Sequence, residues 1–209
     1  MQVAIDGPAG AGKTSVGREI ARQFSLLFIQ SGKLYRALAY GKINGIELDS
    51  LSLEPGEGAE AELLIGDESV TEELDTEEIG EEASKMAKLT RIRNLVNDTI
   101  IEIARERSVL VEGRDIGTAV LTDADIKIYL TADIEERARR RGKQLGVASE
   151  KEILEKMISR DNRDQDRDIA PLKAADDAFI IDSTNLALSE TVNEVCDIID
   201  RELSSNEKI

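Results

Sequence analysis

Residues 7–14 of the chain read GPAGAGKT, and this short stretch decides the fold. Its spacing, Gly-x-x-x-x-Gly-Lys-Thr, is typical of a phosphate-binding loop (P-loop). In such a loop backbone N–H groups surround phosphate oxygens, the lysine reaches the β- and γ-phosphates, and the hydroxyl binds Mg²⁺. A match with four free positions also arises by chance in turns, so the flanking sequence has to decide between the two.

The flanking residues favour the P-loop. A short apolar run at residues 3–5 precedes the loop, and Val16, Ile20 and Phe24 follow it at helical spacing. The motif requires a strand, the loop and a helix in this order, because the helix N-terminus adds unpaired N–H groups and partial positive charge. The sequence therefore predicts a site for nucleotide phosphates at Gly7, Pro8, Ala9, Gly10, Ala11, Gly12, Lys13, Thr14 and Ser15.

The composition narrows the possible chemistry. The chain has 209 residues, enough to bury the core of one domain with an inserted subdomain. It has no histidine and one cysteine, which excludes histidine-dependent nucleophiles and the common zinc sites. The groups that remain available for catalysis are carboxylates, cationic side chains, Mg²⁺ and the backbone. Phosphoryl transfer fits this set, because it asks the protein mainly for positioning and charge neutralisation.

The charge of the chain is unevenly distributed. The formal net charge is −16, and the stretch between Lys42 and Lys85 holds fifteen acidic residues without any lysine or arginine. This pattern indicates a solvated acidic surface and argues against nucleic acid as a partner. No apolar run approaches membrane-spanning length, and the first strand follows Met1 almost directly. We expect a cytoplasmic protein without membrane contact, and a monomer because no heptad seam is present.

Strands and helices alternate along the chain. Short apolar runs predict strands at residues 3–5, 26–29, 109–111, 126–130 and 179–181. Amphipathic stretches predict further helices at residues 34–43, 77–89, 91–107, 134–145, 150–160 and 190–203. Continuous apolar strands are typical of a parallel sheet covered on both faces. The sequence therefore predicts an α/β fold, a doubly wound five-stranded parallel sheet with the P-loop after its first strand.

Residues 44–88 interrupt this alternation and are interpreted as an acidic insertion that closes over a substrate. Within it, ELLIGDESV (62–70) predicts a hairpin around Gly66 and Asp67. Two capping boxes are expected at helix starts, Asp75-x-x-Glu78 and Ser149-x-x-Glu152.

The arginines form the next informative group. Arg114 and Asp115 follow the third predicted strand, at the sheet edge where ligands bind in open α/β sheets. Arg160, Arg163 and Arg167 have helical spacing and would share one helix face. The interleaved aspartates also allow a salt-bridged surface helix. Because a P-loop is present, a phosphate-facing lid over residues 146–171 is favoured, since guanidinium groups neutralise transferring phosphoryl groups.

Five motifs of the chain resemble, in order, successive signatures of bacterial cytidylate kinases, which have the nucleoside monophosphate kinase fold. They are IDGPAGAGKTS, SGKLYRALA, EGRDIGTAV, IKIYLTADIEERARRR and RDNRDQDRDIAPLKAADDAFIIDST. The resemblance implies one P-loop kinase domain over residues 1–209, with a nucleotide-binding insertion at 44–88 and the lid. It also implies ATP as the donor, CMP or dCMP as the acceptor, and Mg²⁺ as the cofactor.

The resemblance implies residues for the acceptor nucleotide. Asp115, Ser84 and Arg93 would read the cytosine edge. This suits cytosine, whose N4 donor matches a carboxylate and whose N3 and O2 acceptors match a guanidinium. The other implied contacts are to the phosphate from Arg36, Arg114 and Arg167, to the ribose from Arg160 and Asp164, and to the nucleotide from Ser31.

The resemblance also implies residues for the donor and for catalysis. Lys13 and Thr14 would serve ATP and Mg²⁺, and Arg137 and Arg141 would reach the donor phosphates. Glu112 is a candidate for ordering the water molecules around Mg²⁺, with an ordinary strand-end carboxylate as the alternative. The residues expected to carry catalysis are Lys13, Arg114, Arg163 and Arg167.

The residues themselves leave two alternative functions open. One is another small-molecule P-loop kinase, acting on UMP, AMP or shikimate. The other is a nucleotide-binding module without transfer chemistry. The chain also departs from the family pattern at Gln30, where an aspartate is usual, and at Lys33, where a small residue is usual. These departures concern the acceptor pocket and leave the reaction class unchanged.

Overall fold

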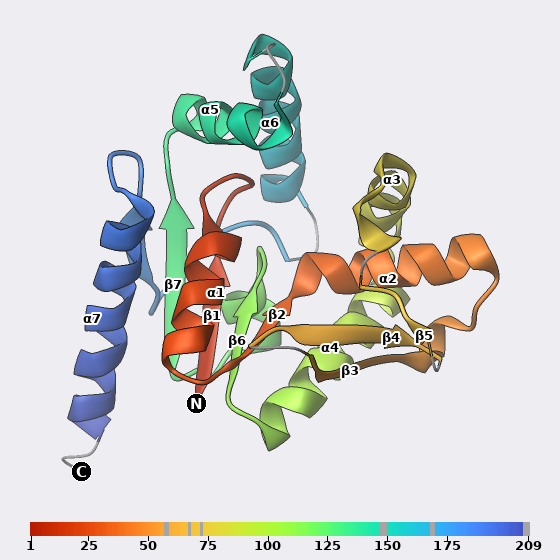
Figure 1. Cartoon of the computed structure of the whole chain (residues 1–209), viewed down its shortest axis with the longest axis horizontal. Helices are drawn as coiled ribbons and strands as arrows, with labels where there is room; N and C mark the ends of the chain where they lie inside the picture. The colour runs from red at the N-terminus through yellow and green to blue at the C-terminus, as the bar shows by residue number, and fades with distance from the viewer. Residues whose placement is uncertain (57–58, 67, 72, 147–149, 168–169, 207–209) are drawn as a thin grey trace. The chain divides into compact units, whose positions relative to one another are not determined.

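The structure is a computed structural model that describes residues 1–56, 59–66, 68–71, 73–146, 150–167 and 170–206 (Figure 1). The chain divides into two compact units. The first comprises Met1 and residues 21–111, and the second comprises residues 2–20 and 112–209. The P-loop, Arg114 and the expected lid belong to the second unit, which is called the P-loop unit below.

The predicted fold class is confirmed. Five strands form a parallel sheet in the order β2-β6-β1-β7-β8. In the P-loop unit β1 pairs with β7 in parallel, with Val3 opposite Ile126, and β7 pairs with β8, with Ile128 opposite Phe179. Val3 and Ile128 are almost fully buried, as expected for a sheet covered on both faces. The strand bounds are β1 Gln2–Asp6, β2 Leu27–Gln30, β6 Val109–Glu112, β7 Ile126–Thr131 and β8 Phe179–Asp182.

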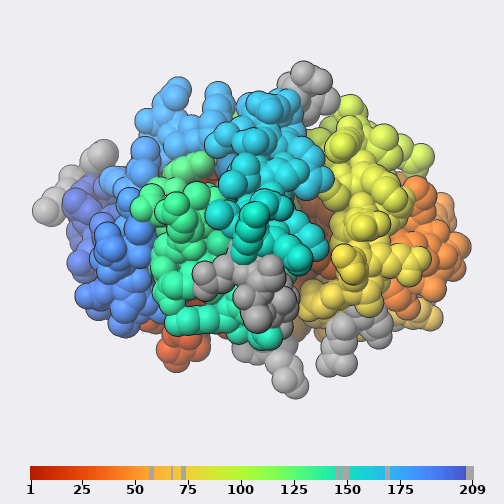
Figure 2. All heavy atoms as spheres, turned by 90° about the horizontal axis from the view of Figure 1, so that it is seen from above, coloured from red at the N-terminus to blue at the C-terminus, as the bar shows by residue number. Residues whose placement is uncertain are grey.

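Helices follow the strands in the P-loop unit. Helix α1 (Lys13–Gln23) begins within the P-loop, a π-helical turn (Ile116–Val120) follows β6, and α7 (Leu188–Asn206) closes the chain. Helices α5 (Ile134–Leu145) and α6 (Glu150–Gln165) lie side by side after β7 (Figures 1 and 2). Ala138, Ile153 and Met157 form the small apolar core between them.

Helix α6 corrects one prediction. It continues five residues past the predicted end at residue 160 and stops at Gln165. Arg160 and Arg163 therefore lie on the helix, but Arg167 lies beyond its end, so the three arginines do not share one helix face. The expected capping box that begins at Ser149 lies outside the described residues.

The other unit contains the predicted insertion. The hairpin of β4 (Ala61–Ile65) and β5 (Glu68–Ser69) is confirmed, with Ile65 opposite Glu68. A further strand, β3 (Leu51–Pro55), pairs with β4 in antiparallel and was not predicted. The remaining elements are α2 Ser31–Asn44, a 3₁₀ turn Leu48–Ser50, a 3₁₀ turn Glu73–Asp75, α3 Glu77–Met86 and α4 Thr90–Glu106.

The start of α3 differs from the predicted capping box by one residue. The N-cap is Thr76, whose side-chain oxygen accepts the N–H of Ile79 at 3.3 Å. Asp75 was the wrong choice, because it belongs to the preceding 3₁₀ turn. Across the described ranges, none of the helices is both long and apolar enough to cross a membrane.

Candidate active site

The P-loop begins with a glycine that no other residue can replace without strain. Gly7 has φ +148°, and a Cβ atom at this position would lie 1.9 Å from the carbonyl oxygen of Leu130 on β7. Only glycine combines this backbone conformation with such a close approach. The first turn of the loop is therefore packed directly against the carboxyl end of β7.

Lys13 is folded into the P-loop. Its Nζ donates to the carbonyl oxygens of Gly7 at 2.9 Å and Pro8 at 2.8 Å, and the residue is 6% exposed. Within the described part of the chain these bonds occupy two of its three N–H groups, which leaves one for a phosphate oxygen. Burial, together with the nearby Arg114 guanidinium, holds the pKa of Lys13 well below its usual range. The site therefore gathers positive charge that an anionic ligand would stabilise.

Thr14 and Glu112 form the pair best suited to a divalent cation. The Thr14 hydroxyl lies 2.8 and 3.0 Å from the two carboxylate oxygens of Glu112 and donates to them. Hydroxyl and carboxylate oxygens are ligands that Mg²⁺ accepts, and Mg²⁺ usually keeps several waters and phosphate oxygens besides. The described residues hold no cluster of three metal-binding side chains. Two protein oxygen ligands leave coordination positions for water and phosphate oxygens, so the pair fits a cation that a bound nucleotide also ligates.

Three predicted acceptor residues form one charged cluster in the P-loop unit. Arg114 Nε donates to Asp164 Oδ2 at 3.0 Å, and Arg167 Nη2 donates to Asp164 Oδ1. The Asp164 side chain is 5% exposed, whereas those of Arg114 and Arg167 are 18% and 28% exposed. One buried carboxylate thus holds two partly exposed guanidinium groups, which keep further N–H donors for an anion. We call Arg114, Asp164 and Arg167 the arginine cluster.

Arg137 connects α5 with the P-loop and α6. Its Nη1 donates to the carbonyl oxygen of Ala9 at 3.0 Å and to Asp161 Oδ2 at 2.6 Å, and its Nε donates to Ala132. The side chains of Arg137 and Asp161 are 8% and 11% exposed. Asp161 Oδ1 is buried and lacks a hydrogen-bond partner among the described residues. Arg137 therefore orders the loop and the α5–α6 pair in this structure.

The other predicted residues of the P-loop unit are placed as follows. Asp115 is buried, and Arg160 is exposed on α6 but near enough to Lys13 to act on its pKa. Arg163 is exposed and donates to the Ser159 carbonyl of its own helix at 3.1 Å. Arg141 is exposed and donates to Gln144 on α5. Arg141 and Arg163 are thus bonded along their own helices.

Four predicted acceptor residues belong to the other unit. Ser31 begins α2, and Arg93 is buried on α4. Arg36 Nη1 donates to the carbonyl oxygens of Leu74 at 2.7 Å and Thr76 at 3.3 Å. Ser84 is exposed on α3.

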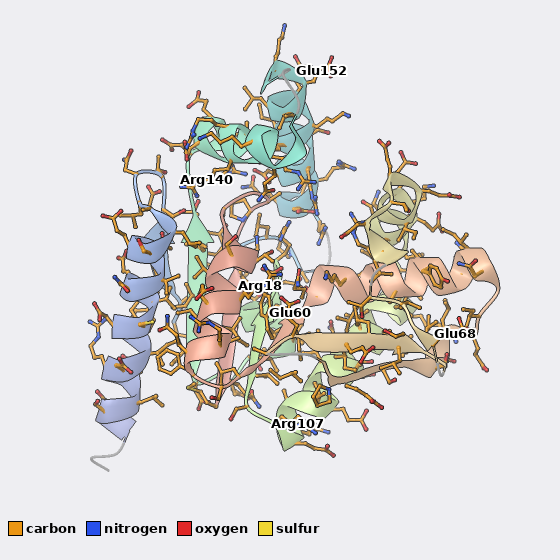
Figure 3. The ribbon with its side chains drawn as sticks, viewed as in Figure 1. Arg18, Glu60, Glu68, Arg107, Arg140 and Glu152 are labelled. Carbon is orange, nitrogen blue, oxygen red and sulfur yellow. The ribbon has the colours of Figure 1, made fainter. Side chains whose placement is uncertain are left out.

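The unusual residue Gln30 has an acidic partner in the same unit. Its side-chain amide nitrogen lies 3.4 Å from Glu60 Oε2 and donates to it (Glu60 is labelled in Figure 3). An aspartate at position 30 would place two like charges together, so Gln30 suits the acidic insertion of this chain.

Sequence reasoning missed several residues that hold the P-loop. Ser183 is buried, and its hydroxyl donates to the carbonyl oxygens of Ala11 at 3.2 Å and Thr131 at 3.1 Å. Arg140 on α5 (labelled in Figure 3) donates to the Ser183 hydroxyl at 3.0 Å. One available signal was a serine two positions after the predicted strand at 179–181. Asp6, directly before Gly7, was the other.

Asp6 should give the stability of the chain a characteristic pH dependence. Burial, reinforced by the Asp115 charge, raises the pKa of Asp6 from 3.8 to about 6, although N–H donors at Gly117 and Ile116 act against the shift. The folded chain therefore binds a proton more tightly than the unfolded chain does. The Asp6 contribution to the free energy of unfolding is largest below pH 3.8 and falls as the pH rises to about 6.

The expected total change is about 3 kcal/mol, from a shift of roughly two pKa units. Denaturant unfolding of the native chain and of Asp6→Asn between pH 4 and 7.5 measures it. The native chain should lose stability relative to the variant as the pH rises. A difference between the two proteins that stays constant over this range would contradict the raised pKa.

A P-loop after the first strand of a parallel sheet, with a guanidinium near enough to its lysine to lower the lysine pKa, is typical of P-loop kinases. The family model described as "Cytidylate kinase" matches residues 3–201, and the chain belongs to this family. A cytidylate kinase from Thermosipho melanesiensis is 39% identical over 95% of this chain and 96% of its own length. One from an Exiguobacterium species is 36% identical over 93% and 94%.

Solved structures support the fold. A gluconokinase from Sinorhizobium meliloti has a TM-score of 0.56 at 16% identity, over 99% of this chain and 95% of its own. At this identity the likeness concerns the fold alone.

Proposed function

We propose that this protein transfers the γ-phosphoryl group of ATP to CMP and dCMP, with Mg²⁺ as cofactor. The observation that carries the proposal is the arginine cluster, which follows β6 in the same unit as the buried P-loop lysine. Phosphoryl transfer needs a donor and an acceptor phosphate held in line with their charge neutralised. The P-loop supplies the first group of contacts and the cluster supplies the second.

The roles of the residues follow from their chemistry. Lys13 donates its remaining N–H to the donor phosphates, and its ammonium stabilises the charge that develops during transfer. Arg114 and Arg167 orient the acceptor phosphate, because guanidinium groups bind phosphate with two parallel hydrogen bonds. Thr14 and Glu112 would hold Mg²⁺, which would supply charge neutralisation at the phosphate oxygens. No covalent intermediate on the protein is required.

Asp115 is proposed to select cytosine. A buried carboxylate accepts from the N4 amino group of cytosine, whereas uracil presents an acceptor at that position. The uracil base would leave the carboxylate unpaired, which disfavours UMP. Arg93 and Ser84 complete the base contacts in the proposal, Ser31 and Arg36 contact the nucleotide, and Arg160 with Asp164 contacts the ribose.

The segments around these residues are proposed to act in closure. Residues 146–171 would form a lid, with Arg137, Arg141 and Arg163 neutralising the transferring group and the donor phosphates. The acidic insertion at 44–88 would cover the acceptor. The cytoplasmic location, the monomeric state and the lack of nucleic-acid or membrane partners stay predictions.

A panel of acceptors tests the proposed function. With ATP and Mg²⁺, formation of ADP should require added CMP or dCMP, and kcat/KM for UMP, AMP and shikimate should be lower by at least about a hundredfold, since each wrong contact costs about 1–3 kcal/mol. Omission of Mg²⁺ should abolish turnover. A preference for another acceptor would replace CMP in the proposal, and ATP binding without any transfer would identify a non-catalytic module.

A further inference from the structure

Asp6 is a buried carboxylate for which the proposed reaction has no direct use. It is the last residue of β1, it directly precedes the P-loop, and it is 4% exposed. Its Oδ1 accepts the N–H of Ile116 at 2.9 Å, and its Oδ2 accepts the N–H of Gly117 at 2.8 Å. Each carboxylate oxygen therefore holds one backbone donor at the start of the π-helical turn.

These bonds hold the segment that carries Arg114 and Asp115. On the other side of the two residues, the N–H of Gly113 donates to the carbonyl oxygen of Ile5 at 3.0 Å. The segment is thus attached to β1 both before and after the pair. Asp115 has φ −146° and ψ 23°, which is neither helical nor extended backbone, and its carbonyl oxygen accepts the N–H of Ala119 at 2.9 Å.

The chemistry of the contact calls for a carboxylate. Two backbone donors need two acceptor oxygens, and an asparagine would offer one oxygen and turn an amide NH₂ toward the second N–H. A Cβ atom on Gly117 would lie 3.5 Å from Asp6 Oδ2, which is ordinary contact, and 3.2 Å from the Lys127 side chain, which is tight.

We propose that Asp6 is a positioning residue for acceptor recognition, which fixes Arg114 and Asp115 by holding the N–H groups of Ile116 and Gly117. This inference rests on the proposed function. Because Asp6 also precedes Gly7, the same strand end determines where the P-loop begins and where the acceptor-binding segment stands. Asp6 thereby fixes the position of the acceptor contacts relative to the donor contacts.

Steady-state kinetics of Asp6→Asn test the proposal. The KM for CMP should rise about tenfold, and the KM for ATP should change less than about twofold, since one misplaced buried hydrogen bond is worth roughly 1.4 kcal/mol. Discrimination against UMP should weaken in parallel. The matched control is Asp125→Asn, because Asp125 accepts the N–H of Gln2 at 2.7 Å at the other end of β1. It should leave both constants unchanged.

A double-mutant cycle with Asp115→Asn shows whether Asp6 acts through Asp115. If it does, the combined variant should discriminate between CMP and UMP no worse than Asp115→Asn alone. Additive losses would overturn the proposal, as would an equal rise of both KM values in Asp6→Asn. If Asp115→Asn itself keeps the native acceptor profile, the base-reading role in the proposed function fails, independently of Asp6.

A second variant covers the case in which Asp6→Asn folds poorly. Gly117→Ala keeps the carboxylate but adds a methyl group beside Asp6 Oδ2 and the flexible Lys127 side chain. We expect it to raise the KM for CMP about threefold with the KM for ATP unchanged, because it shifts the same contact without removing it. A native KM for CMP in a folded Gly117→Ala would count against the proposal.

Discussion

Replacement of Lys13 by alanine should lower kcat by about a thousandfold or more, because the ammonium stabilises charge in the transition state of transfer. The fold should persist. The variant loses hydrogen bonds to Gly7 and Pro8, but it also removes a buried charge whose pKa is lowered by burial and by Arg114. These two effects on stability have opposite signs. The melting temperature without nucleotide should therefore shift by only a few degrees.

Coupled ADP assays and thermal unfolding measure the two parts of this prediction. ATP should raise the melting temperature of the native chain by mass action, and the rise should be much smaller for Lys13→Ala. Lys151→Ala is the matched control, since this lysine is exposed on α6. Near-native turnover of a folded Lys13→Ala would remove the lysine from the catalytic site.

Asp164→Ala should be the most damaging single change in the arginine cluster. The structure shows Asp164 as the buried partner of Arg114 and Arg167, so the variant leaves two cations without their carboxylate. We expect a loss of about 2–4 kcal/mol in stability and roughly a hundredfold in kcat/KM, because a charged partner is removed from a buried network. The loss in kcat/KM should be large for both CMP and dCMP.

This expectation differs from the one that the sequence supports. A ribose contact alone would make Asp164→Ala narrow the gap between CMP and dCMP, because only CMP has a 2′-hydroxyl. Measurement of kcat/KM for both acceptors separates the two roles. The exposed neighbour Asp166 provides the control, and Asp166→Ala should cost under about 1 kcal/mol, as exposed charges do. A loss confined to CMP would reject the structural role of the cluster.

The sequence predicted the parts of the fold that depend on local pattern. All five strands were located from short apolar runs, and the P-loop was located from its glycines and its lysine. Strand β3 was missed because LSLEP has only two apolar residues and ends in proline, and because its pairing with β4 depends on residues about ten positions away. The N-cap of α3 was misplaced because Thr76 and Asp75 are both good capping residues, and only the geometry selects one.

The site could be predicted in its residue types but not in its pairings. Arg114, Asp164 and Arg167 were each identified, yet the bond between Arg114 and Asp164 joins positions 50 residues apart. The bond between Asp6 and Ile116 spans 110 residues. Such contacts arise from strand order, which brings distant segments to one sheet edge. A single sequence shows which groups are charged, and the fold decides which charges meet.

Asp161 Oδ1, which lacks a hydrogen-bond partner among the described residues, has a consequence for how firmly Arg137 is held. A buried acceptor without a partner raises the free energy of the state that contains it by about 1–3 kcal/mol. The arrangement in which Arg137 bridges Ala9 and Asp161 is therefore held less firmly than its short ion pair alone implies. A phosphate that competes for Arg137 therefore has less free energy to overcome in disturbing this arrangement.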